Sequence, residues 1–401
     1  MAKIKVLLVD DEPAILRVVQ LAMLSTIDCE VATALSGDEA LLLMEKDPAD
    51  VLVADIKMPG MDGIALVDKV AELYPKTMRL ILSARTNGEL GLRAAGATHQ
   101  FYLKPTDVNI IANRIKRIIK LRNVMPSAGM EQMISQIRSL PSIPAVYTAL
   151  SRELRNSKSS MEKIGRILEQ DIAMSAKVLQ LVNSAFFGMR EHVNKPSLAV
   201  VLLGEKVLQS LLLGLHIFTE WSRPEVPFFS IQKLWQHSLN VATSAQALAL
   251  AEGFGETTAT EFYAGGLFHD IGKIVIAENM PESFAQAHRM SHEREIPLIQ
   301  AEKEVLGTTH AEAGAYLMAL WGFSDNIVNM CAYHHVPSNF AQPGFTPVTA
   351  VHLANVFDHE HMTSYKDSVT LDKSYIQREG FERKMENWRS VMLRAAKKQP
   401  G

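Results

Sequence analysis

The sequence has 401 residues, of which 47% are hydrophobic and 21% charged, and its formal net charge is −3. At about 150 residues per domain this length predicts two or three domains, and the charge excludes a global basic field that would attract nucleic acid or an anionic membrane. The only cysteines, Cys29 and Cys331, match no disulfide or metal spacing, which fits a reducing cytoplasm. The most apolar long stretch, residues 197–218, carries Glu205 and Lys206 in its middle, so we interpret it as buried helix rather than a membrane span.

Residues 1–122 alternate between short apolar runs and helix-length amphipathic stretches. The runs are rich in Val, Ile and Leu and occupy residues 5–9, 51–54, 80–82 and 101–103. Strands separated by helices predict βαβ units, and strands that are apolar throughout are buried on both faces. We therefore expect an α/β domain of the flavodoxin-like kind, with a doubly wound, five-stranded parallel sheet.

Residues 107–121 are predicted to form the last helix of this domain. Its isoleucines include adjacent pairs such as Ile110 and Ile111, which point in different directions and exceed what one stripe against the sheet needs. We therefore predict that part of this helix packs against the next domain or against a second copy in a homodimer. Residues 123–130, with Pro and Gly, are predicted to be a short, semi-rigid linker; the alternative is a flexible tether between independent domains.

Polar residues follow the predicted strands. Asp10 and Asp11 come after the first strand, Asp55 after the third, Ser83 ends the fourth and Lys104 follows the fifth. In open α/β sheets these carboxyl ends lie together at the ligand-binding edge. Clustered carboxylates suit Mg²⁺, and a nearby cation and hydroxyl can contact phosphoryl oxygens. This set predicts a phosphoryl-transfer site.

Residues 3–121 closely resemble the receiver domains of two-component response regulators. The resemblance implies that Asp55 is the phosphoacceptor and that its partner is a histidine kinase or a phosphotransfer protein. It also implies that Asp10, Asp11 and Asp55 hold Mg²⁺ together with the backbone carbonyl of Lys57. The alternative is a degenerate receiver with a structural role only.

The same resemblance assigns the remaining polar and aromatic positions. Ser83, with Asp55 and Lys104, would take part in catalysis, and Ser83 with Phe101 would form the family's switch. Lys104 matches the family's signature lysine and Pro105 its cis-proline.

From Met130 onward the strand pattern disappears, and Leu, Ala and Met at i, i+3 and i+4 spacing predict an all-α domain. The phrases IRSLPSIPAVYTAL, GRILEQDIAMSAKVLQLVNSAFFGM and SLAVVLLGEKVLQSLLLG closely resemble the HDOD family, a helical output domain related to the HD superfamily. We assign residues 131–375 to this domain, in two halves that meet at residues 228 and 229. Residues 376–401 are predicted to be a C-terminal helix and tail.

The second half holds a set of potential metal ligands, which are His237, His269, Asp270, His310, His334 and His335. An adjacent His-Asp pair with distant histidines resembles the metal site of HD-superfamily phosphohydrolases. Imidazole with carboxylate suits Fe, Mn, Zn or Co, and Lys273 would contact a phosphate. The alternative is that these residues are buried, hydrogen-bonded remnants of an enzyme scaffold.

Two departures bear on activity. The position that best matches the last carboxylate ligand of that superfamily is Asn355, and Asp358 could replace it only if the helix register shifts. His334 and His335 precede Val-Pro-Ser-Asn-Phe, whereas the cyclic-di-GMP phosphodiesterases of the superfamily carry a Gly-Tyr-Pro loop there.

These patterns predict a phosphorelay response regulator that acts through protein–protein interaction with a downstream partner. The alternative is a phosphorylation-gated, metal-dependent phosphohydrolase that acts on a nucleotide or cyclic dinucleotide, so the sequence leaves enzyme activity open. No helix-turn-helix or other DNA-binding pattern follows the first domain.

Overall fold

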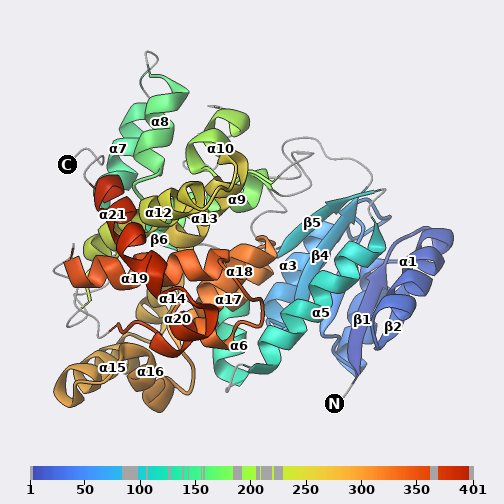
Figure 1. Ribbon diagram of the computed structural model, residues 1–401. Helices are drawn as coiled ribbons and strands as arrows, with labels where there is room; N and C mark the ends of the chain where they lie inside the picture. Colours follow the sequence, from blue (N-terminus) through green and yellow to red (C-terminus); the bar gives the residue numbers. More distant parts are fainter. Residues whose placement is uncertain are drawn as a thin grey trace.

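The computed structural model shows a sheet domain followed by a helical domain (Figure 1). The residues that the structure describes are 3–83, 98–104, 107–124, 128–137, 140–142, 144–154, 156, 159–183, 192–204, 208, 219–220, 229–361 and 369–396.

The sheet domain contains five parallel strands in the order β2-β1-β3-β4-β5. Its elements are β1 (Ile4–Val9), α1 (Pro13–Thr26), β2 (Cys29–Ala34), α2 (Gly37–Lys46), β3 (Val51–Ala54), α3 (Gly63–Leu73), β4 (Met78–Ser83), β5 (Gln100–Leu103) and α5 (Val108–Val124). Val9 pairs with Ala54 in the register of β1 and β3, so the residues that follow these strands lie at the same edge. The predicted α/β sheet is confirmed.

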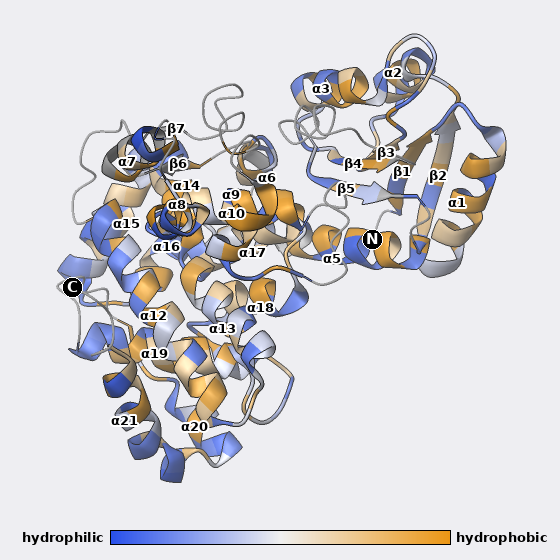
Figure 2. Ribbon diagram, turned by 90° about the horizontal axis from the view of Figure 1, so that it is seen from above, coloured by the Kyte–Doolittle hydropathy of each residue, from blue (hydrophilic) through white to orange (hydrophobic). Residues whose placement is uncertain are grey.

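Alternation along the strands explains why both faces are covered. Val6 and Leu8 of β1 pack with α1 and α5, whereas Leu7 and Val9 pack with α2 and α3. Figure 2 shows the sheet between these two helix layers. Because successive strand side chains point to opposite faces, a strand between two helix layers is apolar at every position.

The remainder of the chain is mostly helical. Its elements are α6 (Ala128–Ser135), β6 (Pro141–Ser142), α7 (Pro144–Leu154), α8 (Met161–Leu168), α9 (Ile172–Val182), α10 (Pro196–Leu203), β7 (Thr219–Glu220), α12 (Ile231–Ala251), α13 (Glu256–Phe268), α14 (Ile271–Asn279), α15 (Pro281–Arg294), α16 (Leu298–Leu306), α17 (His310–Leu320), α18 (Asp325–Tyr333), η3 (Pro337–Asn339), α19 (Pro347–His361), α20 (Lys373–Glu379), η4 (Glu382–Lys384) and α21 (Met385–Ala396).

One feature of this domain differs from the sequence-based expectation. β6 and β7 form a two-stranded parallel pair although no strands were predicted, because two residues are too few to show an alternating pattern. Of the apolar stretch 197–218, the described part is residues 197–203 of α10, Gly204 and Leu208. Among the described residues no helix is long and apolar enough to cross a membrane.

The predicted linker is largely helical. α5 continues to Val124 and α6 begins at Ala128, whereas the helix was predicted to end at residue 121. Arg122 explains the extension, because its guanidinium lies 2.7 Å from Asp50 of the sheet domain and 3.5 Å from Glu131 of α6. Residues 125–127 lie outside the described residues.

The predicted boundary at residues 375 and 376 falls inside α20. The segment that follows is part of the packed domain, since Trp388 of α21 is fully buried and donates a hydrogen bond from Nε1 to Glu252 Oε1 at 2.8 Å. The predicted C-terminal helix therefore contributes to the core.

The two domains are packed together through α5. Ile111 and Ile115 of α5 belong to the same hydrophobic core as Tyr316 and Leu320 of α17. Arg114 donates a hydrogen bond to the carbonyl of Gly322 at 2.7 Å. The prediction that this helix packs against the next domain is confirmed, in place of the alternative of independent domains on a flexible tether.

Candidate functional site

Two carboxylates and a lysine lie together at one edge of the sheet. Asp10 follows β1 and Asp55 follows β3, and these strands are neighbours. Lys104, which follows β5, places its Nζ 2.5 Å from Asp10 Oδ2 and 2.7 Å from Asp55 Oδ1. The structure thus brings three of the residues predicted for phosphoryl transfer into direct contact.

The carboxylates are buried, and each has further hydrogen bonds. The amide of Glu12 donates to Asp10 Oδ1 at 3.0 Å, and the amide of Lys57 donates to Asp55 Oδ2 at 2.6 Å. Burial alone would lower the pKa of Lys104, but its hydrogen bonds with the two carboxylates raise that pKa above the ordinary value. Two carboxylates share one ammonium, and the remaining negative charge fits a hard divalent cation such as Mg²⁺.

The structure describes the other residues predicted for this site to different extents. Asp11 is exposed. Ser83 ends β4, where it pairs in register with Leu103, and its side chain lies outside the described residues. Phe101 is buried in the core between the sheet and the α2–α3 layer. Pro105 also lies outside the described residues.

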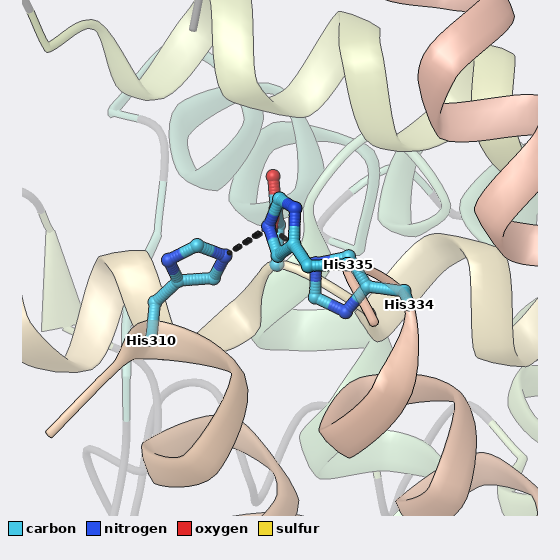
Figure 3. Close-up of side chains that lie close together, drawn as sticks. His310, His334 and His335 are labelled. Carbon is cyan, nitrogen blue, oxygen red and sulfur yellow. Dashed lines mark hydrogen bonds and ion pairs between the residues drawn. The ribbon is translucent and has the colours of Figure 1, made fainter. Parts of the chain in front are cut away.

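The second candidate site is the imidazole cluster, which we define as His237, His269, Asp270, His310, His334 and His335. His237 belongs to α12, His269 and Asp270 lie between α13 and α14, His310 begins α17, and His334 and His335 follow α18. Figure 3 shows the part formed by the last three histidines. The structure brings together all six residues predicted for an HD-like metal site.

The Asp270 carboxylate lies between two halves of the cluster. Its Oδ1 is 3.1 Å from His310 Nε2 and 3.5 Å from His334 Nε2. Its Oδ2 is 3.4 Å from His269 Nε2 and 3.6 Å from His237 Nε2. Potential ligand atoms lie within 4.8 Å of one another in two groups that share Asp270, which are Asp270, His310, His334 and His335, and His237, His269 and Asp270.

Backbone carbonyls fix two of the imidazoles. His269 Nδ1 lies 2.7 Å from the carbonyl oxygen of Gly266, and His334 Nδ1 lies 2.8 Å from that of Cys331. A carbonyl oxygen can only accept, so each Nδ1 carries the proton. In the neutral ring, each Nε2 then offers a lone pair to the centre of the cluster.

Carboxylates fix two further imidazoles in the same manner. Glu302 Oε2 lies 2.7 Å from His310 Nδ1 and also accepts the His310 amide at 2.9 Å. Asp358 Oδ2 lies 2.6 Å from His237 Nδ1. Carboxylates behind ligating histidines orient the ring and increase its basicity at metal sites.

The spacing of the imidazole nitrogens supplies a geometric test for a metal ion. His310 Nε2 lies 2.9 Å from His335 Nε2 (Figure 3), and His237 Nε2 lies 3.2 Å from His269 Nε2. Two nitrogens that are each about 2.1 Å from one ion, at angles of about 90–110°, would be about 3–3.4 Å apart. The residues therefore fit a transition-metal ion.

Burial and neighbouring charges shift the pKa values of the histidines in this cluster in different directions. Burial lowers the pKa of His334 to about 3 and, with the charge on neighbouring imidazoles, holds the pKa of His335 well below its ordinary value. Burial alone would also lower the pKa of His310, but Glu302 and Asp270 raise it to about 9. His334 and His335 are thus neutral at pH 7, as metal ligation requires, whereas His310 would have to release a proton before its Nε2 could ligate a metal ion.

Lys273, predicted as a phosphate contact, faces the carboxylate at the centre. It is buried, and its Nζ lies 2.8 Å from Asp270 Oδ2. Burial alone would raise the pKa of Asp270, but the charges of His269 and Lys273 hold it well below its ordinary value. Asp270 is therefore ionised, and the ammonium of Lys273 neutralises part of its negative charge.

The two residues considered for the position of the last carboxylate ligand both lie on α19. Asp358 lies behind His237, on its Nδ1 side, and its Oδ1 accepts a hydrogen bond from Asn240 Nδ2 at 2.8 Å. Asn355, one turn earlier on α19, is buried, and neither polar atom of its amide has a hydrogen bond with the described residues. The cluster therefore offers five imidazoles and one carboxylate.

Sequence reasoning did not identify Glu302, although the pattern contains a signal for it. Leu298, Ala301 and Leu306 form the buried stripe of α16, and Glu302 lies on the same stripe. An acid on an otherwise apolar stripe needs a buried partner, because an unpaired buried charge is costly. His310 is that partner.

Comparison with known proteins identifies both domains. The model described as "Response regulator receiver domain" matches residues 6–116, and that described as "HDOD domain" matches residues 140–337. The chain therefore belongs to the response regulators. Within that class, it carries a receiver domain followed by an HDOD domain.

Individual relatives are distant. An uncharacterized protein of Treponema pallidum is 27% identical over 227 residues, 55% of this chain and 43% of that protein. The hydrogenase transcriptional regulatory protein HoxA of Cupriavidus necator is 29% identical over 160 residues, 39% of this chain and 31% of that protein. The crystal structure of the MmoQ response regulator from Methylococcus capsulatus aligns with 63% of this chain and 98% of its own, at 20% identity and a TM-score of 0.47. The alignments thus span less than half the length of these two curated relatives.

Proposed function

We propose that this chain is a phosphorelay response regulator, that a histidine kinase or phosphotransfer protein phosphorylates Asp55, and that the HDOD domain transmits the signal by binding a downstream protein. The observation that supports this best is the contact of Lys104 with both Asp10 and Asp55 at the edge of the sheet. A cation in this position can stabilise the charge that develops during phosphoryl transfer.

The chemistry assigns a role to each charged group. A carboxylate oxygen of Asp55 attacks the phosphorus of a phosphohistidine, so a P–O bond forms as the P–N bond breaks. Mg²⁺ held by Asp10, Asp11, Asp55 and the Lys57 carbonyl would neutralise the phosphoryl oxygens. Lys104, already within hydrogen-bond distance of Asp55, would then contact the transferred group.

Acetyl phosphate with Mg²⁺ tests this proposal, with intact mass as the readout. The wild-type chain should gain one phosphoryl group, and the Asp55→Ala variant should gain none. Asp47→Ala is a suitable control, because that side chain is exposed, and it should label like the wild type. Equal labelling of Asp55→Ala and the wild type would contradict the assignment.

A second candidate function, metal-dependent phosphoester hydrolysis, is supported by the convergence of imidazole nitrogens on Asp270. The cluster would hold an Fe, Mn, Zn or Co ion, which would activate a water molecule for attack on phosphorus. The substrate class would be a nucleotide or cyclic dinucleotide. Lys273 would have to leave Asp270 before it could contact a phosphate.

Metal analysis of the purified chain separates this candidate from a scaffold role. A metal site predicts stoichiometric transition metal that is lost in His269→Ala and kept in His292→Ala, which changes an exposed histidine. Hydrolysis of a model phosphodiester should follow the metal content. A metal-free wild-type chain that gains neither metal nor activity when Mn²⁺ is added would leave only the scaffold role.

A further inference from the structure

α17 and α18 form a helical hairpin that joins the receiver domain to the imidazole cluster. The turn between them, residues 321–324, lies against the receiver domain, and the opposite ends carry His310, His334 and His335. α17 has 11 residues and α18 has 9; at about 1.5 Å per residue they span about 16 and 13 Å. One compact element therefore contacts the receiver at one end and forms part of the imidazole cluster at the other.

The receiver supplies the C-terminal cap of α17. The last carbonyls of a helix have no partner within the helix. Gln100 of β5 donates from Nε2 to the carbonyls of Ala319 at 2.8 Å and Leu320 at 3.2 Å, and Arg114 of α5 donates to the carbonyl of Gly322 at 2.7 Å. A guanidinium at this end also interacts favourably with the helix dipole.

A second arginine holds the beginning of α18. Arg117 of α5 donates to the carbonyl of Asp325 at 3.0 Å and to Asn329 Oδ1 at 3.0 Å, and it forms an ion pair with the Asp325 carboxylate. The receiver thus holds one side of the turn, and on the other side Ser324 donates a hydrogen bond to Glu261 of α13.

β5 connects this turn with the phosphorylation site. Gln100 and Tyr102 are alternate residues of β5, so their side chains point to the same side of the sheet, and Lys104 directly follows the strand. The Tyr102 hydroxyl donates a hydrogen bond to Gln100 Oε1. Lys104 contacts Asp55, so the residue that would respond to a phosphoryl group lies four positions from the residue that caps α17.

We infer that the receiver controls the order of the imidazole cluster through the α17–α18 hairpin, with Gln100, Arg114 and Arg117 as the positioning residues. This inference rests on the proposed function for its input, because a phosphoryl group on Asp55 would compete for Lys104 and shift β5. Coupling between two sites is reciprocal, so a cation bound at the imidazole cluster would change the free energy of the receiver contacts by the same amount.

Hydrogen exchange on the full-length chain tests the hairpin without any need for phosphorylation. Loss of a charge-assisted hydrogen bond in Arg114→Ala should accelerate exchange of residues 317–329 about tenfold, and the acceleration should extend to His310 and His334. Lys120→Ala, an exposed change on the same helix, should have no effect. Arg117→Ala gives an independent perturbation from the α18 side if Arg114→Ala folds poorly.

Two outcomes separate this inference from the proposed function. If Arg114→Ala and Arg117→Ala accelerate exchange only at the turn, or nowhere, while the cluster end is unchanged, coupling through the hairpin is wrong. Beryllofluoride with Mg²⁺, a phosphoryl mimic, should alter exchange of the same residues in the wild type and not in Asp55→Ala. If the arginine variants act as expected and beryllofluoride does not, the hairpin coupling stands and Asp55 is not its input.

Discussion

Lys177 of α9 gives a test of the energetics at the domain junction. Its side chain is buried, and its Nζ lies 5.2 Å from the centre of the Trp321 ring, in the turn that the receiver caps. Burial lowers its pKa from 10.5 to about 7. The nearby His99 of the receiver also has a pKa well below its ordinary value, through burial and the charges of Arg79 and Lys177. We expect Lys177→Met to stabilise the protein.

The magnitude follows from the pKa of Lys177. At about 1.4 kcal/mol for each tenfold change, a decrease from 10.5 to about 7 costs the charged lysine about 5 kcal/mol. Methionine of similar length removes that cost but also loses the contacts of the ammonium, among them the cation–π contact with Trp321, worth about 1–2 kcal/mol. The free energy of unfolding should therefore rise by about 3 kcal/mol at pH 6.

The lowered pKa of Lys177 sets the direction in which the stability of the protein changes with pH. Below pH 7 the lysine is charged in both the folded and the unfolded state, so the whole cost is present. Between pH 7 and 10.5 the unfolded chain binds more protons, so the stability of the wild type rises with pH. The advantage of Lys177→Met should shrink by about 2–3 kcal/mol between pH 6 and pH 9.

Urea unfolding of the wild type and the variant at both pH values measures this difference, because the other titrating groups are common to the two proteins. Lys233→Met, a change at an exposed position, should alter stability by less than about 0.5 kcal/mol at either pH. Equal stability at pH 6, or parallel pH profiles for Lys177→Met and the wild type, would refute the assignment of a buried, destabilising charge.

Two further predictions concern the imidazole cluster. Gly272→Ala should destabilise the protein by more than about 3 kcal/mol, because its Cβ would lie 1.9 Å from the His310 carbonyl oxygen, whereas Gly255→Ala meets open space and should be tolerated; thermal unfolding compares them. Glu302→Gln should weaken Mn²⁺ binding about 10- to 100-fold in titration calorimetry, because the carboxylate behind His310 is lost. Glu304→Gln on the same helix should bind like the wild type, and equal affinities for all three proteins would contradict a supporting role for Glu302.

The sheet and its acidic edge were predictable because they depend on local pattern. Apolar runs followed at once by Asp10 and Asp55 reveal strand ends, and parallel pairing brings those ends together. The six residues of the imidazole cluster were found through an adjacent His-Asp pair. The role of Asp358 was not predictable, because a shift of one helical turn decides whether a side chain faces the centre or supports a histidine from behind.

The sequence predicted only part of the junction between the domains. The paired isoleucines of α5 predicted an extra buried face; Ile111, Ile118 and Ile119 are buried in the core, whereas Ile110 is 50% exposed. The contact of Gln100 with Ala319 crosses 219 positions, and no local pattern distinguishes that glutamine from one that faces solvent. The extension of α5 to Val124 likewise depends on Asp50, which lies far away in the sequence.

The hydrophobic core that continues from α5 into α17 limits how freely this receiver can be exchanged. A foreign receiver joined at α6 would leave α17 without the side of α5 that packs on it and without the hydrogen bonds from Gln100 and Arg114. An HDOD domain expressed alone would expose the same surface and tend to associate through it. An exchanged receiver therefore has to match α17 and the turn that follows it on the side of α5 that carries Arg114 and Arg117.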